Sequence, residues 1–70
     1  MITQEDIDKR FTYHSPKGSQ PERYVALRNK ARELAMDILA KTPTSREQSL
    51  ALTALEEAVM WANAAIARNE

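Results

Sequence analysis

The chain has 70 residues, with no cysteine, a single glycine and 10 basic residues balanced by 10 acidic ones. This length accommodates one small domain, and the absence of cysteine excludes disulfide stapling and thiolate metal sites. Zero net charge does not favour binding along a nucleic-acid polymer, because such binding usually requires a basic surface with many phosphate contacts.

Neither membrane association nor secretion is expected. The longest uncharged apolar run covers residues 58–62, far fewer than the ~20 residues of a membrane-spanning helix. Residues 1–6 lack the basic region and apolar stretch of a signal peptide. We therefore expect a soluble, intracellular protein.

The first predicted helix covers about residues 3–10. Thr3 is a suitable N-cap, and Asp6 lies where a negative charge offsets the positive end of the helix dipole. A helix this short is marginal by itself.

Residues 11–20 are predicted to form a loop, because Ser-Pro and Gly-Ser pairs interrupt the helical periodicity. This loop contains two of the four aromatic residues, Phe11 and Tyr13, together with the only histidine, His14, and Lys17. Aromatic faces can stack on nucleobases, and Lys17 and His14 can bind phosphate or a base edge. The alternative is that Phe11 and Tyr13 anchor the loop onto the rest of the protein.

A second helix is predicted over about residues 21–41, with Pro21 favoured at its first position. Its apolar stripe, at spacings of three and four, consists of Tyr24, Leu27, Ala31, Leu34 and Ile38, widened by Ala35 and Leu39. Arg28 on this helix is a second candidate for phosphate binding.

A third helix is predicted over about residues 45–68, after a Thr-Pro-Thr stop. Two capping boxes are possible, Ser45 with Gln48 or Thr44 with Glu47. The turn is short, so the second and third helices should form an antiparallel hairpin. The matching stripe of the third helix consists of Leu52, Leu55, Val59, Ala62 and Ile66.

The third helix has a second apolar face, which one hairpin partner cannot cover. It consists of Ala51, Ala54, Ala58, Trp61 and Ala65. Alanine is simply a good helix former, but Trp61 adds a large apolar area that favours burial. We therefore predict an all-α protein, with a short N-terminal helix and a two-helix hairpin, that assembles into a homo-oligomer.

Charge is divided unevenly along the chain. Residues 1–32 contain seven basic and four acidic residues, a net charge of +3, and residues 33–70 contain three basic and six acidic residues, a net charge of −3. A local site for a compact anion is compatible with this division. The alternative is that the charges form solvated helix faces with ordinary ion pairs.

No catalytic constellation is evident. Tyr13, His14 and Ser15 are neighbours in sequence, but a triad depends on spatial geometry and an orienting third group. No phosphate loop, zinc-protease or nucleophile-elbow motif occurs, and one histidine does not make a metal site. Neither an enzyme nor a metal or cofactor is expected.

Four stretches of the sequence resemble a known family. They read RFTYH at residues 10–14, QPERY at 20–24, SRE at 45–47 and AVMWANAAIARN at 58–69. Over nearly its whole length the chain resembles the tailed-phage anti-CBASS sponges of cyclic oligonucleotides, whose helical hairpin is shared with an anti-Thoeris sponge. The block at 58–69 is the most specific.

The resemblance implies a function and an assembly. CBASS bacteria answer infection by making cyclic di- or trinucleotides that activate a suicide effector, and these sponges bind the messenger without cleaving it. They are homohexamers, with cyclic dinucleotides such as cyclic GMP-AMP between pairs of protomers and cyclic trinucleotides in separate pockets where three protomers meet. The implied location is the cytoplasm of the infected bacterial host.

The resemblance also implies individual roles. Tyr13 matches the family's stacking aromatic, and Arg28 matches a basic residue on the following helix that binds the dinucleotide. Arg68 matches the arginine of the trinucleotide pocket, with Asn69 beside it. The expected dinucleotide site thus comprises Phe11, Tyr13, His14, Lys17 and Arg28.

Two other functions remain open. The first is a small phage DNA-binding or transcription-modulating protein, although a helix-turn-helix predicts a glycine-containing turn and a polar recognition helix, whereas the last helix here is rich in alanine and leucine. The second is a purely structural oligomer, in which Tyr13 and Arg28 only support packing.

Overall fold

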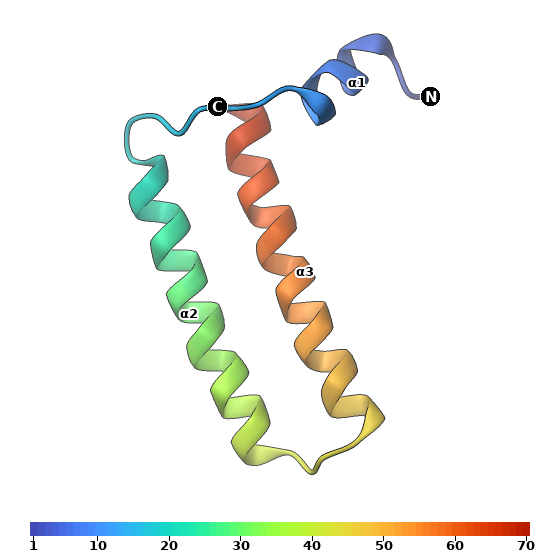
Figure 1. Ribbon diagram of the computed structural model, residues 1–70, viewed down its shortest axis with the longest axis vertical. Coiled ribbons are helices and arrows are strands. Elements are labelled where there is room, and N and C mark those ends of the chain that lie inside the picture. The colour runs from blue at the N-terminus through green and yellow to red at the C-terminus, as the bar shows by residue number, and fades with distance from the viewer.

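The computed structural model describes all 70 residues and contains three helices and no strands. They are α1 (Gln4–Phe11), α2 (Gln20–Lys41) and α3 (Arg46–Asn69). The all-α prediction is confirmed, and each observed helix end lies within one residue of the expected position. α2 and α3 run antiparallel, side by side, whereas α1 lies apart at the open end of the hairpin (Figure 1).

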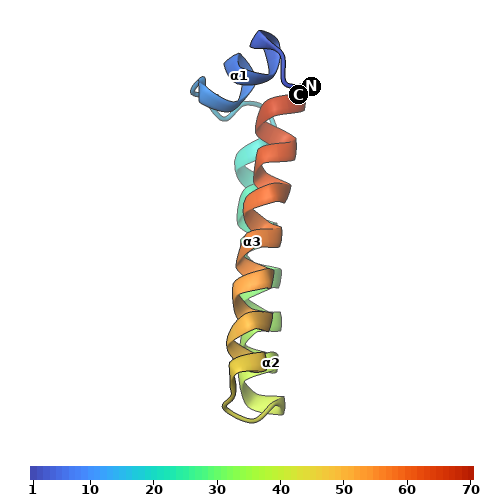
Figure 2. The same cartoon turned by 90° about the vertical axis from the view of Figure 1, so that its right-hand side faces the viewer.

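α1 is held by its own cap rather than by packing. Thr3 and Asp6 form a capping box, in which the Thr3 hydroxyl accepts from the Asp6 amide and the Asp6 carboxylate accepts from the Thr3 amide at 2.9 Å. These bonds stabilise the charged carboxylate and lower the pKa of Asp6. No residue of α1 is buried, and the helix projects to one side of the hairpin (Figure 2).

The turn between α2 and α3 is closed by a single glutamine. Ser45 caps α3 by accepting from the Gln48 amide at 3.1 Å. Of the two predicted pairings, Ser45 with Gln48 is therefore the one that forms the N-cap. The Gln48 side chain does not return this bond to Ser45. Its Nε2 instead donates to the Leu39 carbonyl and to both the carbonyl and hydroxyl of Thr42, which satisfies acceptors that the end of α2 leaves free.

The seam between α2 and α3 is only half-buried in one chain, and no hydrophobic residue is fully buried. On α3 the predicted stripe faces α2 as expected, because all five of its residues are half-buried. On α2 three leucines of the predicted stripe are exposed, Leu27 at 38%, Leu34 at 49% and Leu39 at 53%. The half-buried residues of the stripe are Tyr24, Ala31, Ala35 and Ile38. The seam of α2 therefore runs through smaller side chains than the sequence predicts.

The second apolar face of α3 is exposed in the single chain. Its four alanines are exposed, and Trp61 is 62% exposed, with its Nε1 donating to Glu57 at 3.3 Å. A single chain thus leaves much of its apolar surface in water, which leaves a domain of this size poorly stabilised.

By length and composition α3 is also apolar enough to cross a membrane, with a mean hydropathy of 1.2 over an 18-residue window. This property was not predicted from the sequence, because only uninterrupted uncharged apolar runs were considered, of which the longest has five residues. The adjacent Glu56 and Glu57 lie near the middle of α3, where charged side chains are costly in a bilayer. The core helix of a soluble protein can reach the same length and mean hydropathy.

Candidate ligand-binding site

A pocket of about 470 Å³ lies at the open end of the hairpin, where all three helical segments meet. Nine residues line it: Arg10, Thr12, His14, Tyr24, Arg28, Asn63, Ala64, Ala67 and Arg68. Three are arginines, one is the histidine and none is a carboxylate. A cavity of this composition can bind an anion, because guanidinium groups hydrogen-bond phosphate oxygens in pairs.

Helical spacing brings the pocket residues to one side. Tyr24 and Arg28 are four residues apart on α2, so they lie one above the other on the same face. On α3, Ala64 and Arg68 repeat this spacing beside Asn63 and Ala67. The last turns of α3 and the first turns of α2 therefore form the two walls.

His14 supplies the third wall by turning back onto α1. Its Nε2 lies 3.0 Å from the Lys9 carbonyl, an acceptor that the end of α1 leaves unpaired. A carbonyl only accepts, so Nε2 carries the proton. Nδ1 is then an acceptor in the neutral ring and a donor in the imidazolium.

Asn63 is the one lining residue with an unsatisfied buried atom. Its Oδ1 is buried and has no hydrogen-bond partner within the chain. A buried acceptor without a donor costs free energy. A donor on a bound molecule or on another chain would remove this cost.

The structure brings together three of the predicted site residues and leaves four elsewhere. His14, Arg28 and Arg68 line the pocket. Phe11 and Tyr13 are 83% and 82% exposed, so the alternative that they anchor the loop onto the hairpin is wrong within one chain. Lys17 and Asn69 also lie outside the lining, and the Asn69 side chain donates to the Ala65 carbonyl.

Arg28 and Arg68 therefore share one pocket in the single chain, although the resemblance assigns them to different ligands. A second, more apolar groove of about 610 Å³ between α2 and α3 also reaches Arg28. It continues past Arg32 and Glu56 to Ala35 and Leu52. Arg28 thus lies between a cationic pocket and an apolar groove.

Six lining residues were not predicted for the site, and besides Ala64 and Ala67 they are Arg10, Thr12, Tyr24 and Asn63. Tyr24 was assigned to the helix seam, and its position four residues before Arg28 was the available signal. Asn63 stands out as a polar residue within an apolar tail. Nothing local places Arg10 and Thr12 near α3, because that contact depends on the path of the loop.

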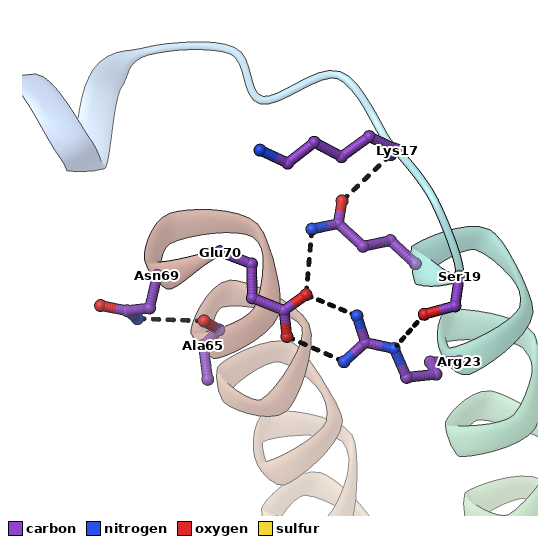
Figure 3. A network of polar contacts seen from close by, with 7 residues as sticks. Lys17, Ser19, Arg23, Ala65, Asn69 and Glu70 are labelled. Atoms are coloured by element: carbon purple, nitrogen blue, oxygen red, sulfur yellow. Dashed lines mark hydrogen bonds and ion pairs between the residues drawn. The ribbon is translucent and has the colours of Figure 1, made fainter.

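A polar network closes the open end of the hairpin beside this pocket (Figure 3). The Arg23 guanidinium donates to both Glu70 carboxylate oxygens, at 2.8 and 2.5 Å. Gln20, only 4% exposed, donates to Glu70 at 3.3 Å and accepts from the Lys17 amide at 3.1 Å. The hydrogen bonds from Arg23 and Gln20 lower the pKa of Glu70 to about 2.

Comparison with known proteins identifies the family. The family model described as "Acb2/Tad1, hairpin domain" matches residues 3–67. No curated protein and no solved structure matches the chain. The matched segment covers all of α1 and α2 and most of α3. It includes Arg10 and Arg28 of the pocket, whereas Arg68 lies one residue beyond it. The chain therefore belongs to the Acb2/Tad1 hairpin family of anti-CBASS and anti-Thoeris sponges.

Proposed function

We propose that this protein binds cyclic di- and trinucleotide second messengers and holds them uncleaved, so that CBASS effectors in the cytoplasm of the infected bacterial host are not activated. The observation that carries the proposal is the family match over residues 3–67, which includes eight of the nine residues that line a pocket with three arginines and no carboxylate. Family membership itself indicates a binding protein rather than an enzyme.

The pocket chemistry suits a cyclic nucleotide. Arg28 on α2 and Arg68 on α3 line the same pocket, and each can bind a phosphodiester through two N–H donors. Tyr24 adds an aromatic ring to the same pocket, and Tyr13 is exposed nearby in the loop, where it is free to stack on a base. Asn63 offers an unused acceptor to a base amino group.

We propose further that the working form is a homo-oligomer, a hexamer as in the family. The exposed Trp61 face and the half-buried seam of the single chain support assembly. A symmetric assembly repeats each arginine around an axis, which suits ligands that are themselves two- or threefold. A preformed pocket between subunits also loses little entropy on binding, which favours tight sequestration.

The hairpin geometry does not favour a DNA-binding protein. α2 and α3 lie side by side along their length (Figures 1 and 2), whereas the two helices of a helix-turn-helix cross at about 90–120°. The net charge of zero also does not favour binding along a phosphate backbone.

The decisive experiment is calorimetric titration of the purified protein with cyclic GMP-AMP, other cyclic dinucleotides and a cyclic trinucleotide. The complex is then denatured by heat and the released nucleotide is analysed by chromatography. We expect binding and recovery of the intact cyclic molecule. A linear product would instead identify an enzyme.

The same preparation is also titrated with duplex DNA. Heat from DNA but from no cyclic nucleotide would overturn the proposal in favour of DNA binding. The absence of heat from every ligand would leave only a structural oligomer.

A further inference from the structure

Two segments that are distant in sequence, residues 17–23 and Glu70, meet beside the arginine pocket (Figure 3). Gln20 and Arg23 at the start of α2 reach Glu70 across 50 and 47 positions of the chain. The loop joins through Lys17, whose amide donates to the Gln20 side chain, and through Ser19, whose hydroxyl accepts from Arg23 Nε at 3.2 Å. We call Gln20, Arg23 and Glu70 the clamp.

The clamp fixes the end of the loop that the α1 contact does not hold. At its start the loop is held to α1 by the hydrogen bond between His14 Nε2 and the Lys9 carbonyl. At its end the Gln20 amide donates to the Lys17 carbonyl, and the Lys17 amide donates back to the Gln20 side chain. Gly18 makes this closure possible, because its φ of +56° is a left-handed conformation that other residues rarely adopt.

The clamp also keeps one negative charge away from the pocket. Glu70 lies two residues after Arg68, within reach of the arginine-rich end of the hairpin. Both of its carboxylate oxygens are bound by Arg23. The chain contains only one other ion pair, Lys41 with Asp37, so none of the three pocket arginines is paired with a carboxylate. They are free to bind an anionic ligand.

We propose that Glu70, held by Arg23 and Gln20, is a positioning residue for the ligand: it orders the loop that contributes to the pocket and leaves the pocket arginines unpaired. This role rests on the proposed function. Glu70 lies outside residues 3–67, so the family match itself assigns no role to it.

The first variant is Glu70→Gln, which keeps the size of the side chain and removes its charge. Its matched control is Asp37→Asn, which removes the carboxylate of the other ion pair at the far end of α2. We expect the Kd for cyclic GMP-AMP to rise about three- to tenfold in Glu70→Gln, because the ligand-ready loop becomes a minor population. Asp37→Asn should change the Kd less than twofold.

A second variant separates positioning by charge from a merely structural contact. Arg23→Ala releases the loop as Glu70→Gln does, but it also leaves Glu70 charged and free to pair with the pocket arginines. We therefore expect Arg23→Ala to weaken cyclic GMP-AMP binding more than Glu70→Gln, and the double variant to recover to the level of Glu70→Gln. Equal Kd values for the two single variants would overturn the charge part of the proposal.

Amide hydrogen exchange at Lys17 measures loop order without any ligand. We expect at least about tenfold faster exchange in Glu70→Gln, with helix amides unchanged, because the opening is local. If the wild type binds and Glu70→Gln has unaltered affinity and exchange, the clamp proposal fails while the proposed function stands. If the wild type binds no cyclic nucleotide but exchange accelerates, the proposed function fails and only the ordering of the loop is retained.

Discussion

The two ends of the hairpin are each closed by a buried glutamine, and these are the only two buried residues of the chain. At the turn end Gln48 is 8% exposed and binds acceptors six and nine positions away, all at the end of α2. At the open end Gln20 binds Lys17 and the distant Glu70. The same side chain thus completes a local turn at one end and a long-range contact at the other.

We infer from this difference that the turn end contributes mainly to folding stability, whereas the open end contributes to ligand binding. At the turn end Gln48 has only uncharged partners, the Lys41–Asp37 ion pair is exposed, and none of the pocket arginines is present. The open end has an ion pair, an ordered loop and the arginine pocket, and it depends on residues that meet only after the hairpin has formed. We expect changes at the turn end to alter folding, and changes at the open end to alter ligand affinity.

The largest effect is expected from breaking the assembly while leaving both ends intact. Trp61→Ala removes the large side chain of the exposed α3 face, which costs about 3–5 kcal/mol if neighbouring copies bury it. We expect dissociation or unfolding, with loss of cyclic nucleotide binding, measured by light scattering with chromatography and by calorimetry. The control is Met36→Ala, an exposed residue outside both apolar stripes.

A dissociated Trp61→Ala protein that still binds cyclic GMP-AMP tightly would show that the open end of one chain is sufficient. An intact Trp61→Ala assembly would show that another surface joins the copies.

The next largest effect is expected from removing an arginine of the pocket, with an arginine at the turn end as the control. Arg28→Ala should weaken cyclic dinucleotide binding about 10- to 100-fold, because a charged hydrogen bond contributes about 1.5–3 kcal/mol. Arg46→Ala at the turn end, outside both pockets, should leave calorimetric affinity unchanged.

Arg68→Ala sharpens the comparison further. We expect it to affect cyclic trinucleotides selectively, and Tyr13→Ala to affect dinucleotides, with no loss of assembly in either variant. If each change weakens both ligand classes equally, the one pocket that Arg28 and Arg68 share in the single chain serves both ligands.

The third effect belongs to the turn end. Gln48→Ala removes three hydrogen bonds and leaves the carbonyls of Leu39 and Thr42 with fewer donors. We expect a loss of about 1–3 kcal/mol in the free energy of unfolding, measured by thermal or urea denaturation. Ligand affinity of the folded protein should stay unchanged. A variant as stable as the wild type would show that water replaces the glutamine at no cost.

The smallest effect is a response to acid at the open end alone. Folding lowers the pKa of Glu70 from 4.5 to about 2, so its contribution to stability is complete above pH 4.5 and is lost as the pH falls towards 2. Arg23 and Lys17 are the cations that act on it. Gln48 does not titrate, so the turn end should not respond.

Amide exchange across this pH range, corrected for its intrinsic pH dependence, should show Lys17 opening in acid while the turn amides stay protected. In Glu70→Gln the acid response of Lys17 should be absent. An equal response in that variant would assign the effect to another carboxylate, such as Asp6 with its own lowered pKa.

Much of the fold was predictable because it is local. Thr3 and Ser45 cap helices through residues three positions away, and the spacing of apolar residues on α3 fixes which face meets α2. The candidate site was predictable only in part. His14, Arg28 and Arg68 were assigned from residue type and resemblance, whereas Tyr24 and Asn63 were missed because both lie within helix patterns typical of packing.

The sequence by itself determined three helices, a short turn that makes two of them antiparallel, and an apolar surface too large for one chain to cover. These properties follow from interactions between residues three or four positions apart. Only the tertiary structure decided that Gln20 and Arg23 meet Glu70, that Ala35 rather than Leu34 lies in the seam, and that arginines from all three helices line one pocket. Such contacts join residues up to 50 positions apart, and they depend on how the helices rotate and the loop closes, which no local spacing specifies.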